Sequence, residues 1–296
     1  MRFYNRWVRW AQGSGSLILT LALLASGGAT QRPDTSTKKV VEAAARYVAD
    51  YQRQLTSVIA DETYTQEIVA QTPRDPQMPR LRRTQSEVFF AYLTTDRHWM
   101  AIRDVISLDG TALTDRPDLR GAFQRLAAGD VPPKFTEVNS RYNIGRTFRN
   151  FNEPTLALLV LDERHRARFS FERKGVEREG NSTLVTIAFT EKDPPTLIQH
   201  QRRGRVFSRG EFIVEAGTGR VRSTLLTAKT DALRLELTTT YGPNDRLGMS
   251  VPTLFREHYE YGSNARNPFS DPAYERVVCE AQYSNFRRFE TSVRIK

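Results

Sequence analysis

Residues 233–241 read LRLELTTTY, and this alternation decides the fold. Leu233, Leu235, Leu237 and Tyr241 are apolar, and the residues between them are polar. Successive side chains of a β-strand point to opposite faces of a sheet. The stretch therefore predicts a strand with one buried face and one solvated face.

The same period of two recurs from residue 166 to the end of the chain. Turn-forming clusters at 193–195, 217–219, 242–245 and 267–269 separate the runs, which is typical of an antiparallel meander. The last strands are expected at 254–261, 276–283 and 286–295. The other runs place these apolar residues on single faces: Ala167, Phe169 and Phe171; Val185, Ile187 and Phe189; Phe212 and Val214; Val221 and Leu225.

The first part of the mature chain predicts a helix followed by strands. Apolar residues recur at spacings of three and four from residue 36 to residue 58, with Ser36 or Thr37 as the hydroxyl cap. The period then changes to two, which predicts strands at 62–69, 86–93 and 99–108.

The middle of the chain predicts two short helices. One covers residues 117–127, and the other covers 154–161 with Pro154 in its first turn. Residues 155–161 read TLALLVL, so this segment must be buried on every side. A buried strand is the alternative interpretation of the same run.

These elements predict an α+β fold with a strongly curved antiparallel β-sheet, an open half-barrel. An N-terminal helix and short helices are expected on its concave face, because the apolar side of a sheet must be covered. Any gap left between helices and sheet would be an apolar pocket.

The N-terminus predicts a secretory signal peptide over residues 1–29. Arg2, Arg6 and Arg9 precede an apolar run at 17–25, which is too short to span a bilayer, and small residues follow to Ala29. We expect a periplasmic or extracellular protein without a stable transmembrane anchor after cleavage. Residues 30–296 would then form one half-barrel domain, with a helical insertion at about 117–161.

The charge balance points to an anionic partner. The whole chain carries a formal charge of +10. The leader holds three arginines and no acid, so the mature chain keeps about +7. A basic exported protein meets anionic lipid or polysaccharide sooner than nucleic acid. The alternative is that the charge serves only solubility.

No motif predicts catalysis, a cofactor or a metal site. The four histidines are scattered and never stand at ligand spacing, and no nucleophile motif or phosphate loop lies outside the leader. We interpret Asp104, Asp109 and Asp115 as turn residues rather than paired catalytic acids. Cys279 alternates with Val277 and Ala281, which predicts a buried, inert thiol.

Residues 141–152 interleave arginines with aromatic residues and asparagines. Arg141, Arg146 and Arg149 can bind an anionic head group, or they can anchor a buried turn through bonds to the backbone. Export makes single-stranded nucleic acid an unlikely partner for this pattern. Both other interpretations stay open at this point.

Five stretches of the chain carry a resemblance: residues 102–105, 108–110, 141–145, 152–156 and 283–289. They resemble a group of uncharacterised exported bacterial proteins, and this resemblance brings no catalytic residues to this chain. The helix followed by strands and the closing stretch also resemble, more distantly, the periplasmic lipoprotein-carrier (LolA-like) fold. That resemblance implies a half-barrel that binds acyl chains inside. This chain is longer than a small carrier, with its extra residues at about 117–161.

We therefore expect an exported, non-catalytic protein that binds a lipid or another hydrophobic ligand. Leu156 and Leu159 would contact the apolar part of the ligand, and Arg141, Arg146 and Arg149 its anionic head group. The alternative is an envelope scaffold or sensor that acts through contacts with another protein. A close-packed interior would favour the scaffold, and an apolar cavity would favour the binder.

Overall fold

The computed structural model describes residues 33–56, 58–93, 98–116, 121, 140–146, 149, 153–200, 204–262 and 274–288. Contacts divide the chain into two units, Met1–Arg32 and Pro33–Lys296. All described residues belong to the second unit. The predicted leader and most of the predicted insertion at 117–161 lie outside them, so the domain organisation stays a prediction.

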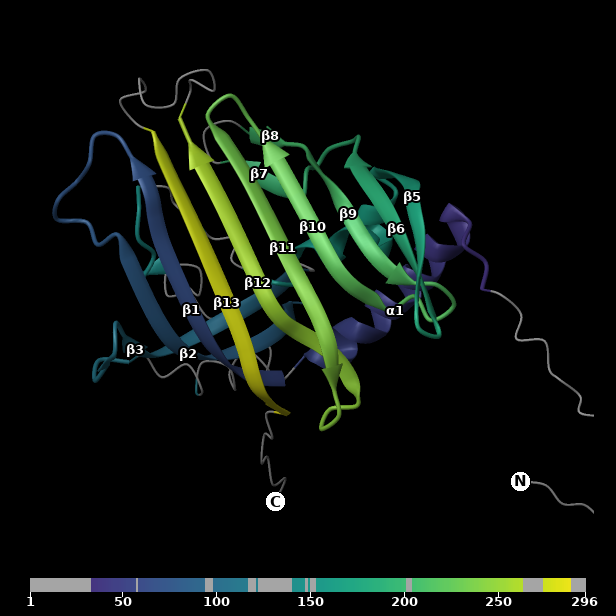
Figure 1. Ribbon diagram of the computed structural model, residues 1–296, viewed down its shortest axis with the longest axis horizontal. Helices are drawn as coiled ribbons and strands as arrows, with labels where there is room; N and C mark the ends of the chain where they lie inside the picture. The colour runs from purple at the N-terminus through teal and green to yellow at the C-terminus, as the bar shows by residue number, and fades with distance from the viewer. Residues whose placement is uncertain are drawn as a thin grey trace, which may run out of the picture. The chain divides into compact units, whose positions relative to one another are not determined.

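One antiparallel sheet of 11 strands dominates the described part of the chain (Figure 1), in the order β4-β3-β2-β1-β13-β12-β11-β10-β9-β6-β5. The order is linear, with β4 at one edge and β5 at the other, so the sheet stays open. The strands are β1 (Val58–Gln71), β2 (Leu81–Leu93), β3 (His98–Leu108), β4 (Thr111–Ala112), β5 (Phe169–Glu179), β6 (Ser182–Glu191), β9 (Ser208–Glu215), β10 (Val221–Lys229), β11 (Leu233–Asn244), β12 (Met249–Tyr261) and β13 (Glu275–Arg288).

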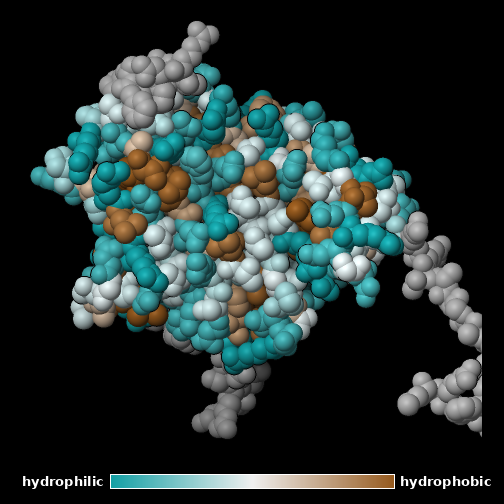
Figure 2. Space-filling model, in the orientation of Figure 1, coloured by the Kyte–Doolittle hydropathy of each residue, from teal (hydrophilic) through white to brown (hydrophobic). Residues whose placement is uncertain are grey.

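The alternation read from the sequence decides which face of each strand is buried. In β11, Leu235, Leu237 and Tyr241 are buried while Arg234 and Glu236 are exposed. The exposed face carries cross-strand ion pairs, such as the one between Arg256 and Glu280 with a nitrogen–oxygen distance of 2.9 Å. Figure 2 shows this face as a mostly hydrophilic surface with scattered hydrophobic residues. The prediction of one wet face is confirmed.

Helix α1 (Thr37–Leu55) covers the other face of the sheet, on the side away from the viewer in Figure 1. It contacts β5 and β6 at one edge and β2 near the other edge. Nineteen residues of helix extend about 28 Å. A straight element of this length reaches both ends of the sheet because the strands curve around it. The predicted curved α+β sheet is therefore confirmed.

The cap of α1 differs from the expectation. Ser36 is the N-cap residue, as predicted, but its hydroxyl makes no capping hydrogen bond. Instead, the Ser36 backbone N–H donates to Asp34 Oδ1 at 2.8 Å. The carboxylate of Asp34 therefore organises the chain just before the helix, and the Ser36–Asp34 bond lowers the pKa of that carboxyl.

The second predicted middle helix is a 3₁₀ helix, η1 (Leu156–Leu161), followed by a single turn of α-helix, α4 (Glu163–Arg166). The alternative of a buried strand is wrong. Pro154 lies just before the N-cap Thr155 and not in the first turn. Its carbonyl oxygen accepts hydrogen bonds from Thr239 Oγ1 and the Tyr241 hydroxyl, each at 2.7 Å. Of the helix predicted at 117–127, only Gly121 lies among the described residues.

Two strand predictions are corrected by bulges. A register shift between Val221 and Ser223 moves the buried face of β10 to Thr224, Leu226 and Ala228, so Leu225 lies on the other face. The strands predicted at 276–283 and from residue 286 are one strand, β13. Asn285, with a φ of 49°, lies in an irregularity of this strand opposite residues 59–61. One residue too many on one strand changes the face without ending the strand.

A small two-stranded sheet was not predicted. It consists of β7 (Ile198–His200) and β8 (Gly204–Val206), which pair with each other and not with the large sheet. Glu191 fixes its base, since its carboxylate accepts from the backbone N–H groups of Leu197 and Ser208. Three-residue strands give too short an alternation to be recognised in a sequence.

Gly219 permits a very close approach between α1 and the turn before β10. Its φ is +74°, and a Cβ atom on it would lie 2.2 Å from the Ala43 carbonyl oxygen and 2.7 Å from the Ala44 nitrogen. These are backbone atoms, which cannot move aside as a side chain can. Only glycine fits at this point of contact between helix and sheet.

We expect Val48→Asp to unfold the domain. Val48 is fully buried between α1 and the sheet. An unpaired carboxylate at this position costs several kcal/mol, against a total stability of about 5–15 kcal/mol. Circular dichroism during thermal denaturation measures the effect. Ala49→Asp is the matched control, because Ala49 is exposed on the same helix. A Val48→Asp variant as stable as Ala49→Asp would show that α1 is peripheral to the fold.

Gly219→Ala is expected to destabilise the domain more than Gly180→Ala. Both glycines have positive φ, but a Cβ atom on Gly180 meets no atom within 4 Å. The control therefore measures the backbone conformation alone, about 1–2 kcal/mol. The clash with α1 adds roughly 1–3 kcal/mol at Gly219. Urea denaturation measures both values, and equal losses would contradict the close approach.

Candidate functional site

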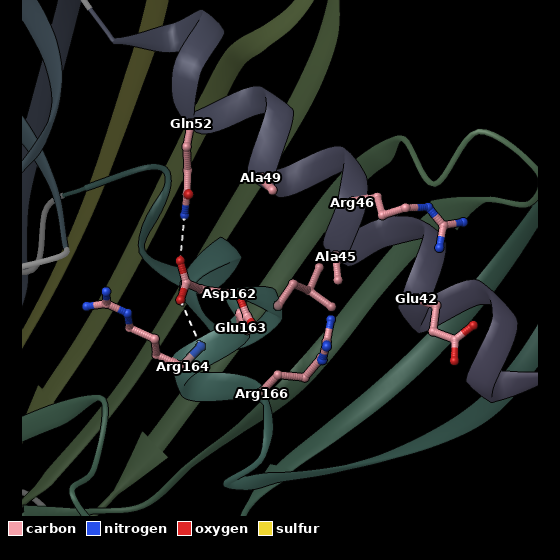
Figure 3. A pocket seen from close by; sticks show the side chains of 10 residues that line it. Glu42, Ala45, Arg46, Ala49, Gln52, Asp162, Glu163, Arg164 and Arg166 are labelled. Carbon is pink, nitrogen blue, oxygen red and sulfur yellow. Dashed lines mark hydrogen bonds between the residues drawn. The ribbon is translucent and has the colours of Figure 1, made fainter. Parts of the chain in front are cut away.

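The helical elements on the concave face meet along one flank of α1. Residues 157–161 of η1 are buried, as their apolar sequence requires, and η1 contacts α1, β3 and β10. Asp162 then ends η1 and caps α4, because its Oδ1 accepts from the Arg164 backbone N–H at 3.0 Å. The other oxygen, Oδ2, accepts from Gln52 Nε2 of α1 at 2.9 Å. This bond joins the two helical elements at one end of their contact (Figure 3).

A groove of about 560 Å³ lies between α1 and the η1–α4 segment. We call it the first groove. Its volume falls in the range of ligand sites, roughly 300–1,000 Å³. Its apolar surface consists of the exposed Ala49 and the edges of the buried residues Ala45 and Leu161. Charged and polar side chains surround them, and Figure 3 shows the Arg166 side chain rising toward α1. The full lining is Glu42, Ala45, Arg46, Ala49, Gln52, Leu161, Asp162, Glu163, Arg164 and Arg166.

The arginines of the first groove differ from its acids in their partners. Across the residues that the structure describes, the guanidinium groups of Arg46, Arg164 and Arg166 form no hydrogen bond or ion pair. Of the three acids, Glu42 pairs with Lys39 Nζ at 3.8 Å and Asp162 accepts two hydrogen bonds, whereas the Glu163 carboxylate has no partner among the described residues. Three cations are thus available at the rim of a small apolar surface. Such a rim favours a ligand that carries negative charge.

The two predicted leucines flank this site without lining it. Leu159 is buried in the core beneath η1, and Leu156 is half-buried at the start of η1. Leu161, from the same apolar run, does reach the first groove. The predicted segment therefore borders the groove, but Leu161 and not Leu156 or Leu159 lines it.

The structure separates the three predicted arginines. Arg149 is 1% exposed, and its Nη2 donates to Gln66 Oε1 at 2.6 Å and to the Ile144 carbonyl oxygen at 2.9 Å. Arg146 donates to the carbonyl oxygens of Thr72 and Pro73. These contacts correspond to the second interpretation of the pattern, in which arginines anchor a turn through backbone bonds.

Arg141 stands apart from the other two arginines. Its side chain is 55% exposed, and its Nη2 lies 3.7 Å from Asp115 Oδ2. Its guanidinium lies 5.5 Å from the centre of the Tyr142 ring. Binding of a ligand by any of these three arginines stays a prediction.

The concave face near β1 and β3 holds a buried ion pair that the sequence did not predict. Arg103 Nε and Nη2 donate to the two carboxylate oxygens of Glu62 at 2.7 and 2.9 Å. Burial lowers the pKa of Arg103, but the charge and hydrogen bonds of Glu62, together with Tyr283 and Tyr64, raise it above its usual value. Beside this pair, burial raises the pKa of Glu153 to about 8, against the smaller opposing effect of Arg103. At neutral pH this carboxyl is mostly protonated.

A second buried polar cluster surrounds Glu257 of β12. The hydroxyl of Tyr64 donates to Glu257 Oε1 at 2.8 Å, and the Tyr259 hydroxyl donates to Oε2. The Arg149 guanidinium lies 5.4 Å from the centre of the Tyr259 ring. Burial raises the pKa of Glu257, although both tyrosines and Arg149 oppose the shift. The two tyrosine hydroxyls satisfy the Glu257 carboxylate, and Arg149 lies against the Tyr259 ring, so the cluster holds Arg149 in place on the sheet.

The three aspartates that the sequence placed in turns lie in different environments. Asp109 lies in a turn with a φ of 51°, and Asp115 is exposed. The prediction for Asp104 is corrected, because this residue is 4% exposed within β3 and forms an ion pair with Arg116. It lies within the strand, among the buried residues 101–105, so the turn interpretation was wrong for this residue. Among the residues that the structure describes, no group of three or more His, Cys, Asp or Glu side chains could hold a metal ion.

The sequence did not point to Arg46, Arg164 and Arg166. Each lies in a segment whose charged residues look like an ordinary solvated face, and the two segments are more than 100 residues apart. The available signal was the apolar run at 155–161 with a cluster of charges directly after it. A helix that is buried on every side places the polar residues that follow it close to the element that covers it.

Comparisons with known proteins give a fold-level similarity only. No family model matches the chain, and no curated protein matches it. Among solved structures, the chain is similar to a domain from Vibrio parahaemolyticus described as an outer membrane lipoprotein-sorting protein. The match covers 86% of this chain and 95% of that chain, with 9% sequence identity and a TM-score of 0.39. This is the distant resemblance expected from the sequence, and at that TM-score it carries no argument about a ligand.

In the part of the chain that the structure describes, no helix is both long enough and apolar enough to cross a bilayer. The described residues form an open antiparallel half-barrel with helices across its concave face. A groove with a cationic rim lies where these helices meet.

We expect Cys279 to resist alkylation in the folded protein. The thiol is buried, as predicted, and burial raises its pKa to about 12. At pH 8 roughly one thiol in ten thousand is then ionised, and the thiolate is the reactive form. Iodoacetamide followed by intact-mass measurement should show no adduct in buffer and one adduct in urea. Complete labelling of the folded protein within minutes would show that the thiol is accessible.

Proposed function

We propose that this protein is exported and binds an amphiphilic ligand in the first groove, without catalysis. The ligand would have an apolar chain that packs on Ala45, Ala49 and Leu161, and an anionic head group that meets the arginines at the rim. The observation that carries the proposal is the combination of an apolar floor with three guanidinium groups that have no partner among the described residues. A ligand with only one of these two properties would leave half of the groove unmatched.

The groove gives a physical reason for preferring an anionic head group. The guanidinium of Arg166 is half-buried, and Arg46 and Arg164 are exposed. A guanidinium offers several donors in a fixed plane, which match a carboxylate or a phosphate. The neighbouring carboxylates of Glu42 and Asp162 are engaged by Lys39, Gln52 and the α4 backbone. Glu163 is the one acid of the lining without a partner among the described residues, so three guanidinium groups face one unengaged carboxylate.

An envelope scaffold is the second candidate function. The interior beneath α1 supports it, because Val48, Leu55 and Val160 are fully buried in one continuous core. A filled core leaves an acyl chain only the groove beside the helix, unless α1 moves away from the sheet. The two candidates therefore differ in whether the groove is occupied in the purified protein.

The first test asks whether the protein carries lipid. Protein purified without detergent is extracted with organic solvent, and the extract is analysed by mass spectrometry. We expect a stoichiometric anionic amphiphile and uptake of a fluorescent fatty acid at micromolar concentration. Absence of both would overturn the binder and leave the scaffold.

The second test separates the head group from the chain. The double variant Arg46→Ser and Arg166→Ser should weaken the affinity for a fluorescent fatty acid by about twofold to thirtyfold. Each exposed ion pair with the head group is worth about 0.2–1 kcal/mol. A neutral analogue should be affected less, and the difference should shrink at high salt. Arg141→Ser is the control, because Arg141 belongs to the other arginine set. A larger loss of affinity in Arg141→Ser would show that the head group binds at the other arginine set and not at the first groove.

Ala49→Trp tests the apolar floor directly. Ala49 is exposed, so the indole fills the first groove without entering the core. Binding of both the fatty acid and its neutral analogue should be lost, whereas Ala49→Ser should retain it. Thermal denaturation confirms that each variant is folded. Unchanged binding in Ala49→Trp would show that the chain lies elsewhere.

A further inference from the structure

A second groove lies on the opposite flank of α1. It has a volume of about 520 Å³ and is formed by the helix, by Arg220 before β10 and by the turn between β11 and β12. We call it the second groove. The proposed function does not use it. Its lining is Tyr47, Asp50, Tyr51, Gln54, Arg220, Pro243, Asn244, Asp245, Gly248, Met249 and Ser250.

The apolar part of the second groove is flat and aromatic rather than deep. The rings of Tyr47 and Tyr51 stack with centroids 5.7 Å apart and an interplanar angle of 25°. Tyr51 is fully buried, and its ring also meets that of Tyr241 edge-on. Tyr47 is half-buried and is held in position by this stack. Pro243 provides a second rigid apolar surface at the exposed end of the groove.

The polar part combines donors with acceptors. The Asn244 side-chain oxygen accepts from the Leu247 backbone N–H at 3.0 Å, which fixes the amide and directs its NH₂ group elsewhere. Across the described residues, the side chains of Gln54 and Asp245 have no hydrogen-bond partner, and both are exposed. Amide and carboxylate groups together can bind the hydroxyl groups of a ligand, because a hydroxyl both donates and accepts hydrogen bonds.

The charges of the second groove argue against an ionic ligand. Arg220 is its one cation in the lining, and its Nε lies 3.6 Å from Glu215 Oε2. Asp50 is paired with Arg53. Asp245 remains, and its carboxylate repels phosphates and carboxylates. A single unpaired carboxylate is also too little to select a cation.

We propose that the second groove binds an uncharged oligosaccharide. A pyranose ring has an apolar face of C–H groups and an edge of hydroxyls, and the groove places the Tyr47 ring beside the fixed amide of Asn244 and the open side chains of Gln54 and Asp245. A lipid tail would leave these polar groups unpaired, which costs free energy. A nucleotide or another anion would approach Asp245 without a free cation to balance it.

The test uses chitotetraose and maltotetraose as two uncharged probes. Isothermal titration of the purified protein should show saturable binding of at least one probe, with a dissociation constant of about 1 mM or tighter. The double variant Gln54→Ala and Asp245→Ala should weaken it by about tenfold or more, since each removes a hydrogen bond to a hydroxyl. These exposed side chains make no contact that the fold needs, so the variant should remain fully folded.

Further variants distinguish stacking from general surface effects. Tyr47→Phe keeps the ring and should retain most of the affinity, whereas Tyr47→Ala should lose it. Arg46→Ala alters the first groove on the same helix and should leave oligosaccharide binding unchanged. 3′-Sialyllactose, which is anionic, should bind more weakly than either uncharged probe.

The inference is overturned if neither probe binds at about 10 mM, or if the double variant binds as tightly as the original protein. It is equally overturned if Arg46→Ala weakens binding as much as the double variant does. These outcomes are independent of the proposed function, because fatty-acid binding at the first groove is measured with a different ligand. A protein that binds the fatty acid and neither oligosaccharide retains the proposed function and loses this inference.

Discussion

The packing of α1 across the concave face of the sheet is the contact on which the rest of the structure depends. The sheet needs a cover because its inner face is apolar over β6 and β9–β11, and α1 needs a partner because Val48 and Leu55 lie on one of its stripes. The helix reaches from β5 and β6 to β2. Its length thereby limits how far the sheet can flatten. Gly219 brings the turn before β10 against the helix backbone, so the spacing between the two layers is fixed by main-chain atoms.

The concave face consists of two regions with different chemistry. Around β6 and β9–β11 it is apolar, with stacked rings such as Phe189 and Phe212, and it holds α1 and η1. Around β1, β3, β12 and β13 it carries buried charges, among them the Glu62–Arg103 pair. Burying such a pair gains little free energy compared with a well-packed apolar replacement. The pair joins β1 to β3 across β2, so a shift in the register of either strand would leave its charges without partners.

The position of α1 creates both grooves. A cylinder on a curved surface touches it along a line and leaves a furrow on either side. On one side η1 and α4 close the furrow, and the Gln52–Asp162 bond joins the two walls. On the other side the turn between β11 and β12 closes it. The first groove collects arginines and the second collects aromatic and amide groups, so one helix separates two surfaces with different ligand preferences. Motion of this helix would change both at once.

The sequence by itself determined the fold class and most strands, because a period of two or 3.6 is a local property and each residue's face follows from its neighbours. It also determined that Cys279 is buried and that residues 155–161 are enclosed. It missed the bulges at Val221 and Asn285, where one additional residue reverses the faces that follow. Only the tertiary structure decided which charges are functional candidates. Arg149 and Arg46 are the same residue type in similarly polar surroundings, yet one is bonded within the core and the other lies at the rim of a groove. That difference depends on contacts between segments more than 80 residues apart, which no local pattern records.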